Sequence, residues 1–381
     1  MAAHALLSPS SAHRWLHCTA SPRLEEHEED KGSVFAQEGT LAHAYCARAL
    51  KRYLGQSTSG EDAEISTLDE LHDAAMDEHV ANYAATVLGK LEALRKGTPD
   101  ARLLVETRLD FSEWVPEAFG TADAVLIADG VMEVVDFKYG KGVRVDAEEN
   151  PQMMIYALGA WKLFDLEYAI DRIRMTIVQP RLEHVSEWEV TVAELLEWAA
   201  STLKPKAEEA YKGGGAQHPG DWCRFCKVRS RCKALARMAQ VTQANFEDPR
   251  LLTPEQLADS VLPNLDTIKT WVSSVEEYAL QRALDGTRFR GWKVVEGRSN
   301  RRVTDPQAVC AVLGGAGYSE DSYLKPRELR SLTDLEKTVG KKKFTELCSD
   351  WLEKPPGKPT LVPESDKRPA LNSAQEDFKD F

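Results

Sequence analysis

No stretch of this 381-residue chain approaches the roughly 18 consecutive apolar residues that a membrane-spanning helix requires. Residues 1–21 also lack a long apolar segment behind a basic start, so a secretory signal is not expected. The seven cysteines are odd in number and unevenly spaced, which argues against a disulfide framework and for a reducing compartment. We therefore predict a cytoplasmic protein with no membrane partner.

Two further absences narrow the range of functions that the chain could have. The sequence has no Gly-x-x-x-x-Gly-Lys-(Ser/Thr) motif, so it is not expected to drive DNA unwinding with ATP. It also lacks an excess of positive charge. The formal net charge is −13, which is unfavourable for binding nucleic acid. Local basic patches bind phosphate, however, and basic residues gather at Arg224–Arg237, Arg288–Arg302 and Lys337–Lys343. Nucleic acid therefore stays among the candidate partners.

What is present is an ordinary globular composition, 43% hydrophobic and 29% charged, in a chain longer than one core usually supports. Strand-like runs alternate with segments of helical spacing, and Asp129-Gly130 predicts a hairpin turn. The expected strands are Arg102–Leu109, Thr121–Ala128, Val131–Lys138 and Ile173–Gln179. The expected helices are Ala12–Cys18, Leu41–Leu54 (opened by Gly39 and Thr40), Leu71–Lys96, Pro151–Phe164 and Val192–Tyr211.

The character of the chain changes after about Val241. Leu257–Leu284 is expected to be helical, and Phe289–Val303 to be a basic, strand-rich stretch. From Glu353 onward five prolines, few apolar residues and mixed charge predict a disordered tail. We therefore expect a first domain over residues 1–240, an accessory helical domain with basic strands over 241–352, and a tail over 353–381.

Four cysteines predict a metal centre. Cys223, Cys226 and Cys232 form a C-x-x-C-x-x-x-x-x-C segment, and Cys18 lies about two hundred residues earlier. Two thiolates three residues apart can face one metal, and four complete the set that tetrahedral zinc or an iron–sulfur cluster requires. The C-x-x-C pair alone favours zinc. The remaining cysteines, which lie in helical patterns and are expected to be small buried residues, are Cys46, Cys310 and Cys348.

An acidic-x-Lys signature ends the strand that follows the hairpin turn. Asp136 and Lys138 are two residues apart, so their side chains share one face of the strand, and Asp123 lies on the strand across the turn. Carboxylates that converge from rigid strands suit Mg²⁺ or Mn²⁺, and a lysine beside them can orient water or stabilise phosphate charge. Taken alone, Asp136 and Lys138 would ordinarily be interpreted as a surface ion pair.

Other polar residues extend this candidate site. Gln152 and Tyr156 are one helical turn apart and share a face, from which both could contact a DNA backbone or Lys138. His43, four residues after Gly39, is a candidate additional metal ligand, and Glu106 is a weaker acidic candidate. Taken singly, His43 would be interpreted as a structural histidine, and Gln152 and Tyr156 as ordinary helix residues.

In this order the motifs resemble the RecB/AddB-type branch of the PD-(D/E)XK nucleases, specifically its iron–sulfur members, which include AddB and the CRISPR-adaptation nucleases. The resemblance covers about residues 8–238. That branch has one cysteine before the nuclease core and three after it, with Gly-x-x-x-His, Gly-x-x-Asp, (Asp/Glu)-x-Lys and Gln-x-x-x-Tyr motifs between them. The matching positions are Cys18, Cys223, Cys226, Cys232, Gly39 to His43, Gly120 to Asp123, Asp136 to Lys138 and Gln152 to Tyr156. Residues 7–15 and 357–361 are also similar to a phage and prophage family of this type.

The resemblance implies an α/β fold with a PD-(D/E)XK restriction-endonuclease-like core, in which helices flank a mixed central sheet. An iron–sulfur cluster would staple this core, and a mostly helical C-terminal region would follow. The implied activity is that of a metal-dependent DNA nuclease, expected to be an exonuclease, in phage or prophage DNA recombination or processing within a bacterial host cell. The implied catalytic residues are Asp123, Asp136, Lys138, Gln152 and Tyr156; the Mg²⁺ or Mn²⁺ ligands are His43, Asp123 and Asp136; the [4Fe–4S] ligands are Cys18, Cys223, Cys226 and Cys232.

The expected partners are DNA and a single-strand annealing or binding protein or a helicase. Zinc is the alternative to the cluster, and a non-catalytic DNA-binding or scaffold protein on the same fold is the alternative to an enzyme. A zinc-stapled protein-interaction module would leave the acidic-x-Lys series unexplained.

A separate DNA contact is predicted in the basic stretch after the nuclease resemblance ends. Arg298, Arg301 and Arg302 lie near Phe289 and Trp292, a mixture that suits phosphate contact with occasional base stacking. An equally favoured interpretation is a solvated hairpin whose aromatic residues pack on the preceding helix.

Overall fold

The computed structural model describes residues 5–28, 32–244 and 253–293 together with Lys342. Met1–Val294 forms one compact unit, to which all of the described residues except Lys342 belong. The domain boundary predicted at residue 240 falls inside helix α9 (Lys233–Ala244). The predicted tail over residues 353–381 lies outside the described residues.

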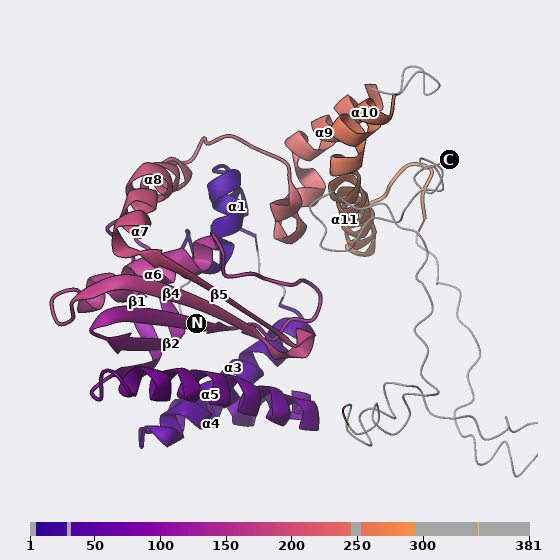
Figure 1. The fold of residues 1–381 in the computed structure, drawn as a ribbon. Coiled ribbons are helices and arrows are strands. Elements are labelled where there is room, and N and C mark those ends of the chain that lie inside the picture. The colour runs from indigo at the N-terminus through magenta and orange to yellow at the C-terminus, as the bar shows by residue number, and fades with distance from the viewer. Residues whose placement is uncertain (1–4, 29–31, 245–252, 294–341, 343–381) are drawn as a thin grey trace, which may run out of the picture. The chain divides into compact units, whose positions relative to one another are not determined.

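A five-stranded mixed sheet forms the centre of this unit, with its strands in the order β1 to β5 (Figure 1). Neighbouring strands are antiparallel except for the parallel pair β3 and β4. The hairpin predicted at Asp129-Gly130 is confirmed, and Gly130 has a φ of 83°, which favours glycine. The strands are β1 (Arg102–Asp110), β2 (Phe119–Ala128), β3 (Gly130–Phe137), β4 (Ile170–Gln179) and β5 (His184–Thr191).

Helices cover both faces of the sheet (Figure 1). Since parallel strands need a crossover connection, helix α6 carries the chain from β3 to β4 across one face. The helices on this face are α1 (Ala12–His17), α6 (Pro151–Phe164), α7 (Val192–Trp198) and α8 (Lys204–Lys212). The helices on the other face are α3 (Val34–Tyr53), α4 (Ser59–Leu68) and α5 (Ala74–Arg95). The mixed α/β architecture with a helix-flanked sheet is therefore confirmed.

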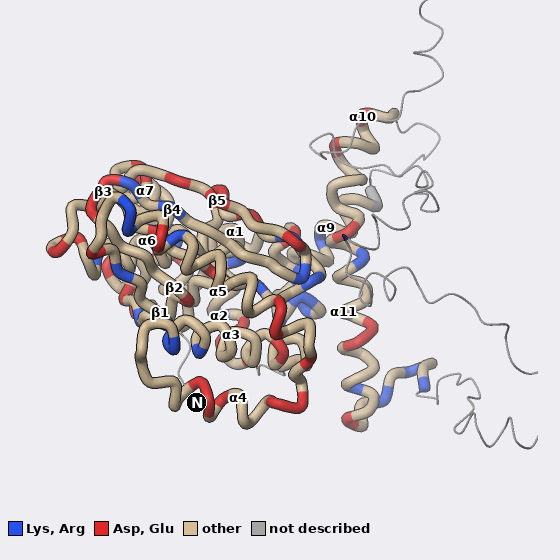
Figure 2. The backbone as a smooth tube through the Cα atoms, turned by 60° about the horizontal axis from the view of Figure 1, so that its bottom comes forward, with Lys and Arg blue, Asp and Glu red and all other residues tan. Residues whose placement is uncertain are grey.

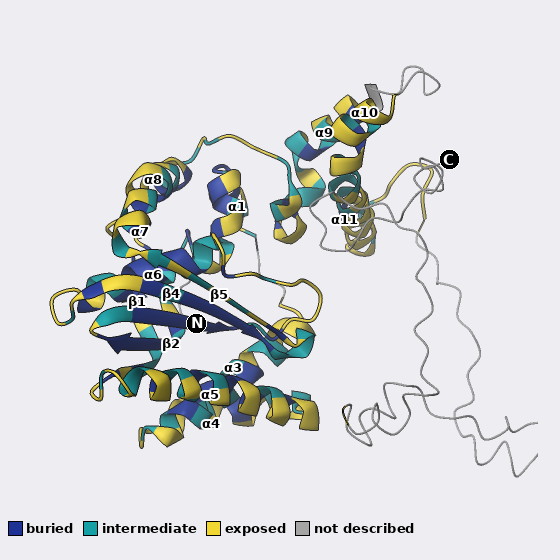
Figure 3. Ribbon diagram, viewed as in Figure 1, coloured by how far each residue is buried: buried dark blue, intermediate teal, exposed yellow. Residues whose placement is uncertain are grey.

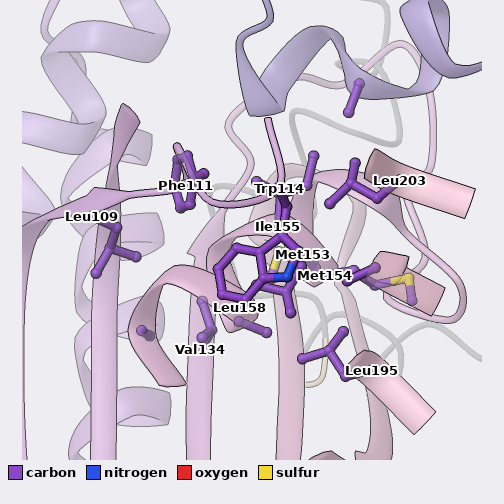
Figure 4. Packing of buried hydrophobic residues seen from close by; sticks show 14 of the residues in the cluster. Leu109, Phe111, Trp114, Val134, Met153, Met154, Ile155, Leu158, Leu195 and Leu203 are labelled. Atoms are coloured by element: carbon purple, nitrogen blue, oxygen red, sulfur yellow. The ribbon is translucent and has the colours of Figure 1, made fainter. Parts of the chain in front are cut away.

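Each face of the sheet has its own hydrophobic core, so the central strands β2 and β3 are buried on both sides (Figure 3). The core on the α6 face includes the fully buried Phe111, together with Trp114 and Met153 (Figure 4). Phe111 fits because Gly159 on α6 has no side chain: a Cβ there would lie 2.4 Å from the Phe111 ring. The core on the α3 face includes Tyr83 and Phe137, whose ring centroids are 4.9 Å apart.

Side-chain caps define where several helices begin. Ser33 Oγ accepts a hydrogen bond from the Ala36 N–H at 3.1 Å, so α3 begins at Val34. The prediction that Gly39 and Thr40 open this helix was therefore wrong, because both lie inside it. α6 begins as predicted, with Asn150 as its cap and Pro151 in its first turn.

The regular elements that follow α8 in the described chain are all helical. After α9 come α10 (Pro254–Gln256) and α11 (Leu265–Leu284), which confirms most of the helix predicted over Leu257–Leu284. Residues 289–293, the described part of the predicted strand-rich stretch, contain no strand. The short helix α2 (Ser21–Glu25) follows α1 near the start of the chain.

Candidate active site

The end of β3 presents the acidic-x-Lys pair toward α6. Lys138 Nζ lies 2.9 Å from Asp136 Oδ2 and 3.3 Å from Asp136 Oδ1. The pair is not the exposed surface ion pair of the ordinary interpretation, because the Asp136 side chain is only 6% exposed. The approach of Lys138 to Oδ2 lacks hydrogen-bond geometry, so Oδ2 is a buried acceptor without a hydrogen-bond partner.

Gln152 on the first turn of α6 holds both members of this pair. Its Nε2 donates to Asp136 Oδ1 at 3.1 Å, and its Oε1 accepts from Lys138 Nζ at 3.0 Å. Its own backbone N–H donates to the cap residue Asn150 at 3.1 Å, so the start of the helix fixes its position. The predicted convergence of Asp136, Lys138 and Gln152 is therefore observed.

Tyr156 lies one turn further along α6, against Phe111, with ring centroids 5.9 Å apart. Burial and the nearby Asp136 carboxylate raise the pKa of Tyr156 well above its usual value, so its phenol stays protonated. A Cβ on Gly120 would lie 3.1 Å from the Tyr156 ring. Glycine at position 120 therefore leaves the space that the tyrosine ring uses.

His43 and Asp123 meet although they come from different layers. His43 Nδ1 on α3 lies 3.3 Å from Asp123 Oδ1 on β2, and Asp123 Oδ2 accepts the Phe137 backbone N–H at 2.7 Å. Burial alone would lower the pKa of His43, but the charge and hydrogen bond of Asp123 outweigh it and raise the pKa to about 9. Asp123 shows the converse: burial would raise its pKa, yet His43 and the Phe137 N–H lower it.

Glu106 on β1 joins this pair. One ligand atom from each of His43, Glu106 and Asp123 lies within 4.8 Å of the others. Glu106 has a φ of 50°, a left-handed conformation that interrupts the regular strand and costs about 1–2 kcal/mol for a residue with a side chain. Burial and the nearby Asp123 carboxylate raise the pKa of Glu106 to about 7. The sequence ranked this residue too low, because its periodicity carries no sign of the irregular strand.

The electrostatics of the site indicate a need for positive charge. Burial raises the pKa of Asp136, with Lys138 opposing the rise and Asp123 adding to it. The carboxylates of Glu106, Asp123 and Asp136 and the imidazole of His43 thus gather beside the middle of β1 and β2 and the end of β3. Carboxylate oxygens with one imidazole are a donor set that suits Mg²⁺ or Mn²⁺.

Sequence patterns missed the residues beside this site. Arg181 follows β4, forms an ion pair with Glu38 on α3 at 2.9 Å, and lies 4.6 Å over the ring of Tyr139. The buried Gln179 holds the chain that leaves the site, because its amide accepts the Val145 N–H at 2.7 Å and donates to the Val143 carbonyl at 3.0 Å. No spacing rule connects these residues, since each contact joins separate elements.

The loop that carries Cys223, Cys226 and Cys232, called the cysteine loop below, packs against the first two helices. The Arg14 side chain donates to the Phe225 carbonyl at 3.3 Å and pairs with Glu25 at 2.9 Å. Burial raises the pKa of the Cys223 thiol, and the Cys18 and Cys232 thiols are close enough to raise it further. Burial also raises the pKa of Cys226 to about 12. The helices on either side of Cys18 therefore lie beside the segment that holds the other three cysteines.

The other cysteines and the basic stretch have separate outcomes. Cys46 is buried on α3, as expected, whereas Cys310 and Cys348 lie outside the described residues. Arg298, Arg301 and Arg302 also lie outside them. Figure 2 shows basic residues just after α11, in the described segment that holds Arg288, Arg290 and Lys293.

Within the described residues, no helix combines the length and the apolar character that crossing a membrane would take.

Comparisons with known proteins match the chain to a family and to distant solved structures. The family model described as "Protein of unknown function (DUF2800)" matches residues 4–369. A solved structure titled "Crystal structure of SSO0001" shares 16% identity, with a TM-score of 0.22 over 57% of this chain and 95% of that chain. A TM-score this low supports no conclusion about fold or function.

Proposed function

The chain belongs to the DUF2800 family, and from its site we propose that it is a metal-dependent DNA nuclease built on a PD-(D/E)XK core. The sequence resemblance adds the expectation of exonucleolytic action in phage or prophage DNA recombination or processing. The observation that carries the proposal is the geometry around Asp136. Its Oδ1 and Lys138 Nζ are bridged by Gln152, while its buried Oδ2 has no hydrogen-bond partner.

This arrangement separates two roles within one small volume. His43, Asp123 and Asp136 would hold the metal ion, and Glu106 adds a carboxylate within 4.8 Å of the His43 and Asp123 ligand atoms. When bound, a divalent cation neutralises charge on the scissile phosphate and activates water. Lys138 supplies a fixed positive charge that can orient the water or contact a phosphate oxygen. Gln152 keeps the ammonium group in place, and the protonated phenol of Tyr156 offers a donor on the same side.

The four cysteines fit a second metal group. Four thiolates are the ligand set that either tetrahedral zinc or an iron–sulfur cluster takes. The sequence resemblance to the iron–sulfur nucleases favours the cluster over zinc. Its role would be to tie the N-terminal helices to the chain that follows α8.

The test uses the full chain, purified without oxygen and incubated with labelled single- and double-stranded DNA and Mn²⁺ or Mg²⁺. We expect the wild type to release nucleotides, and we expect Asp136→Asn and Lys138→Ala to lower the rate by two orders of magnitude or more. Losing a charge that stabilises the transition state typically costs about 3–4 kcal/mol of barrier. The matched control is Lys141→Ala, which removes an exposed lysine three residues beyond Lys138.

Three outcomes are informative. Wild-type rates in Asp136→Asn would refute the assignment of the site. DNA binding without hydrolysis by the wild type would favour the non-catalytic DNA-binding alternative. If the basic stretch contacts DNA, Ser substitutions at Arg298, Arg301 and Arg302 should weaken binding and flatten its salt dependence. A single-strand annealing or binding protein, or a helicase, stays the predicted protein partner.

A further inference from the structure

Seven buried side-chain nitrogen and oxygen atoms in the described part of the chain have no hydrogen-bond partner. At the active site the unpaired atom is an acceptor, the Asp136 Oδ2 discussed above. Four of the others are donor groups on residues around the cysteine loop: Arg14 Nε, Ser21 Oγ, Arg229 Nε and Trp271 Nε1. The last two, His184 Nε2 and Thr242 Oγ1, lie on β5 and α9. The cysteine region therefore has an excess of donors, which is the opposite of the active site.

Two of the four donors come from the N-terminal helices and are tied to Cys18. The Cys18 N–H donates to the Arg14 carbonyl at 2.8 Å, and the Ser21 N–H donates to the Cys18 carbonyl at 2.9 Å. The two Nη atoms of Arg14 are already used by Phe225 and Glu25. This leaves Nε as the unpaired donor of a guanidinium group whose position is fixed.

The other two donors lie in the cysteine loop itself and on the helix that packs against it. Arg229 lies between Cys226 and Cys232: its N–H donates to the Cys226 carbonyl at 3.4 Å, and its carbonyl accepts the Cys232 N–H at 3.2 Å. Trp271 belongs to α11, which packs against the 3₁₀ turns at Asp221–Phe225 and Arg229–Arg231. Trp271, Arg229 and Cys223 line the same cleft of about 390 Å³.

Buried donors without acceptors are costly, and native proteins rarely keep several in one place. A group rich in acceptors would pair them. Four thiolates alone supply acceptors, but the bridging sulfides of an iron–sulfur cluster supply more of them over a larger surface. The excess of donors is therefore the observation that points to such a group.

We propose that Arg14, Ser21, Arg229 and Trp271 donate hydrogen bonds to the sulfurs of a cluster held by the four cysteines, and that they thereby set its reduction potential. This inference rests on the iron–sulfur part of the proposed function, and it assigns α11 a role in the cluster's surroundings. Hydrogen bonds to sulfur stabilise the more negative, reduced cluster. Removing a donor should therefore make reduction less favourable and lower the midpoint potential.

The experiment measures that potential in the full chain, purified without oxygen, by following visible absorbance while dithionite supplies the electron. Ser21→Ala removes only a hydroxyl group, and Trp271→Phe removes only the indole N–H with part of its ring. Each should shift the reduction equilibrium by up to about tenfold, which is about 59 mV for a one-electron couple. Ser21→Thr, which keeps a hydroxyl group, should restore the wild-type value.

The chain offers a matched control for each variant. Trp222 lies in the cysteine loop itself, but its Nε1 already donates to the His218 carbonyl at 2.7 Å, so Trp222→Phe should leave the potential near that of the wild type. Ser10→Ala removes an exposed hydroxyl group that pairs with Ser8. The rate at which a chelator bleaches the cluster is a second measurement, and it should rise in Ser21→Ala and Trp271→Phe only.

Two results would overturn the inference. One is a potential and bleaching rate in Ser21→Ala and Trp271→Phe that match the two control variants. The other is stoichiometric zinc without iron in the purified protein, which would also remove the cluster from the proposed function. Neither measurement uses DNA, so a failed nuclease assay would leave this result standing, and a failed redox result would leave the nuclease assignment standing.

Discussion

Replacing Lys138 with methionine should destabilise the metal-free protein in a strongly pH-dependent way. The substitution keeps the aliphatic part of the side chain and removes the ammonium group that lies 2.9 Å from the Asp136 carboxylate. Asp136 is then a buried carboxyl group supported only by the Gln152 amide, 3.1 Å away. Either it stays charged without a counter-ion, or it takes up a proton.

Proton uptake sets an upper limit on the cost. Keeping a carboxyl group neutral at pH 7, when its pKa in the unfolded chain is about 3.9, costs about 4 kcal/mol, since each pH unit is worth about 1.4 kcal/mol. At pH 5 the same limit is about 1.5 kcal/mol. Losing a hydrogen bond to a charged group costs about 1.5–3 kcal/mol, so we expect a loss of about 2–4 kcal/mol at pH 7 and a smaller one at pH 5.

The direction of this pH dependence follows from the pKa of Asp136. Burial raises this pKa in the wild type, and loss of the Lys138 charge should raise it further. A carboxyl group with a raised folded pKa favours folding below its unfolded pKa, and this contribution is lost as the pH rises through the folded value. The assay is urea unfolding without oxygen and with a chelator, at pH 5 and pH 7, with Lys141→Met as the exposed control. An equal loss at both pH values would refute Lys138 as the counter-ion of Asp136.

Three further predictions concern neighbouring positions. A Cβ at Gly120 would lie 3.1 Å from the Tyr156 ring, so Gly120→Ala should displace Tyr156, slow DNA hydrolysis and cost about 1–3 kcal/mol in urea unfolding; wild-type kinetics would contradict this. A Cβ at Gly39 or Gly89 meets nothing within 4 Å, so alanine at either helical position should raise the free energy of unfolding by about 0.5–1 kcal/mol. Only Gly39→Ala should also slow hydrolysis, because Gly39 is one turn from His43, which we propose as a metal ligand; equal rates in both variants would remove Gly39 from the site. Burial raises the pKa of Glu106 from 4.5 to about 7, so its contribution to the stability of the metal-free protein falls as the pH rises between these values. Glu106→Gln should flatten thermal stability over that range, and an unchanged pH profile would count against the shift.

Much of the site could be predicted because its central part is local in the chain. The Asp129-Gly130 turn sets the register of the hairpin, in which Ala124 pairs with Val135. Asp123 and Asp136 are the next residues on the two strands, so their proximity follows from the turn. Strand periodicity then places Lys138 on the same side as Asp136, and the Asn150 cap places Gln152 at the start of α6.

Other features were missed because local preferences pointed elsewhere. Gly39 resembled a helix start, yet α3 runs through it because the Ser33 cap and the buried face of the helix outweigh the cost of about 1 kcal/mol for one internal glycine. The sequence also did not assign α4 or β5. The amphipathic pattern of α4 is weak, since only Ile65 is buried, and β5 is a strand at the edge of the sheet.

By itself, the sequence determined the hairpin, the acidic-x-Lys pair, the helix that presents Gln152 and the loop that presents three cysteines. Each of these depends on spacing within one or two adjacent elements, which turn chemistry and periodicity encode directly. Only the tertiary structure decided that His43 on α3 lies 3.3 Å from Asp123, that Glu106 joins them, and that α11 reaches the cysteine loop. The contacts of His43 arise because a hydrophobic core packs α3 against one face of the sheet, and no local pattern specifies which residues then meet.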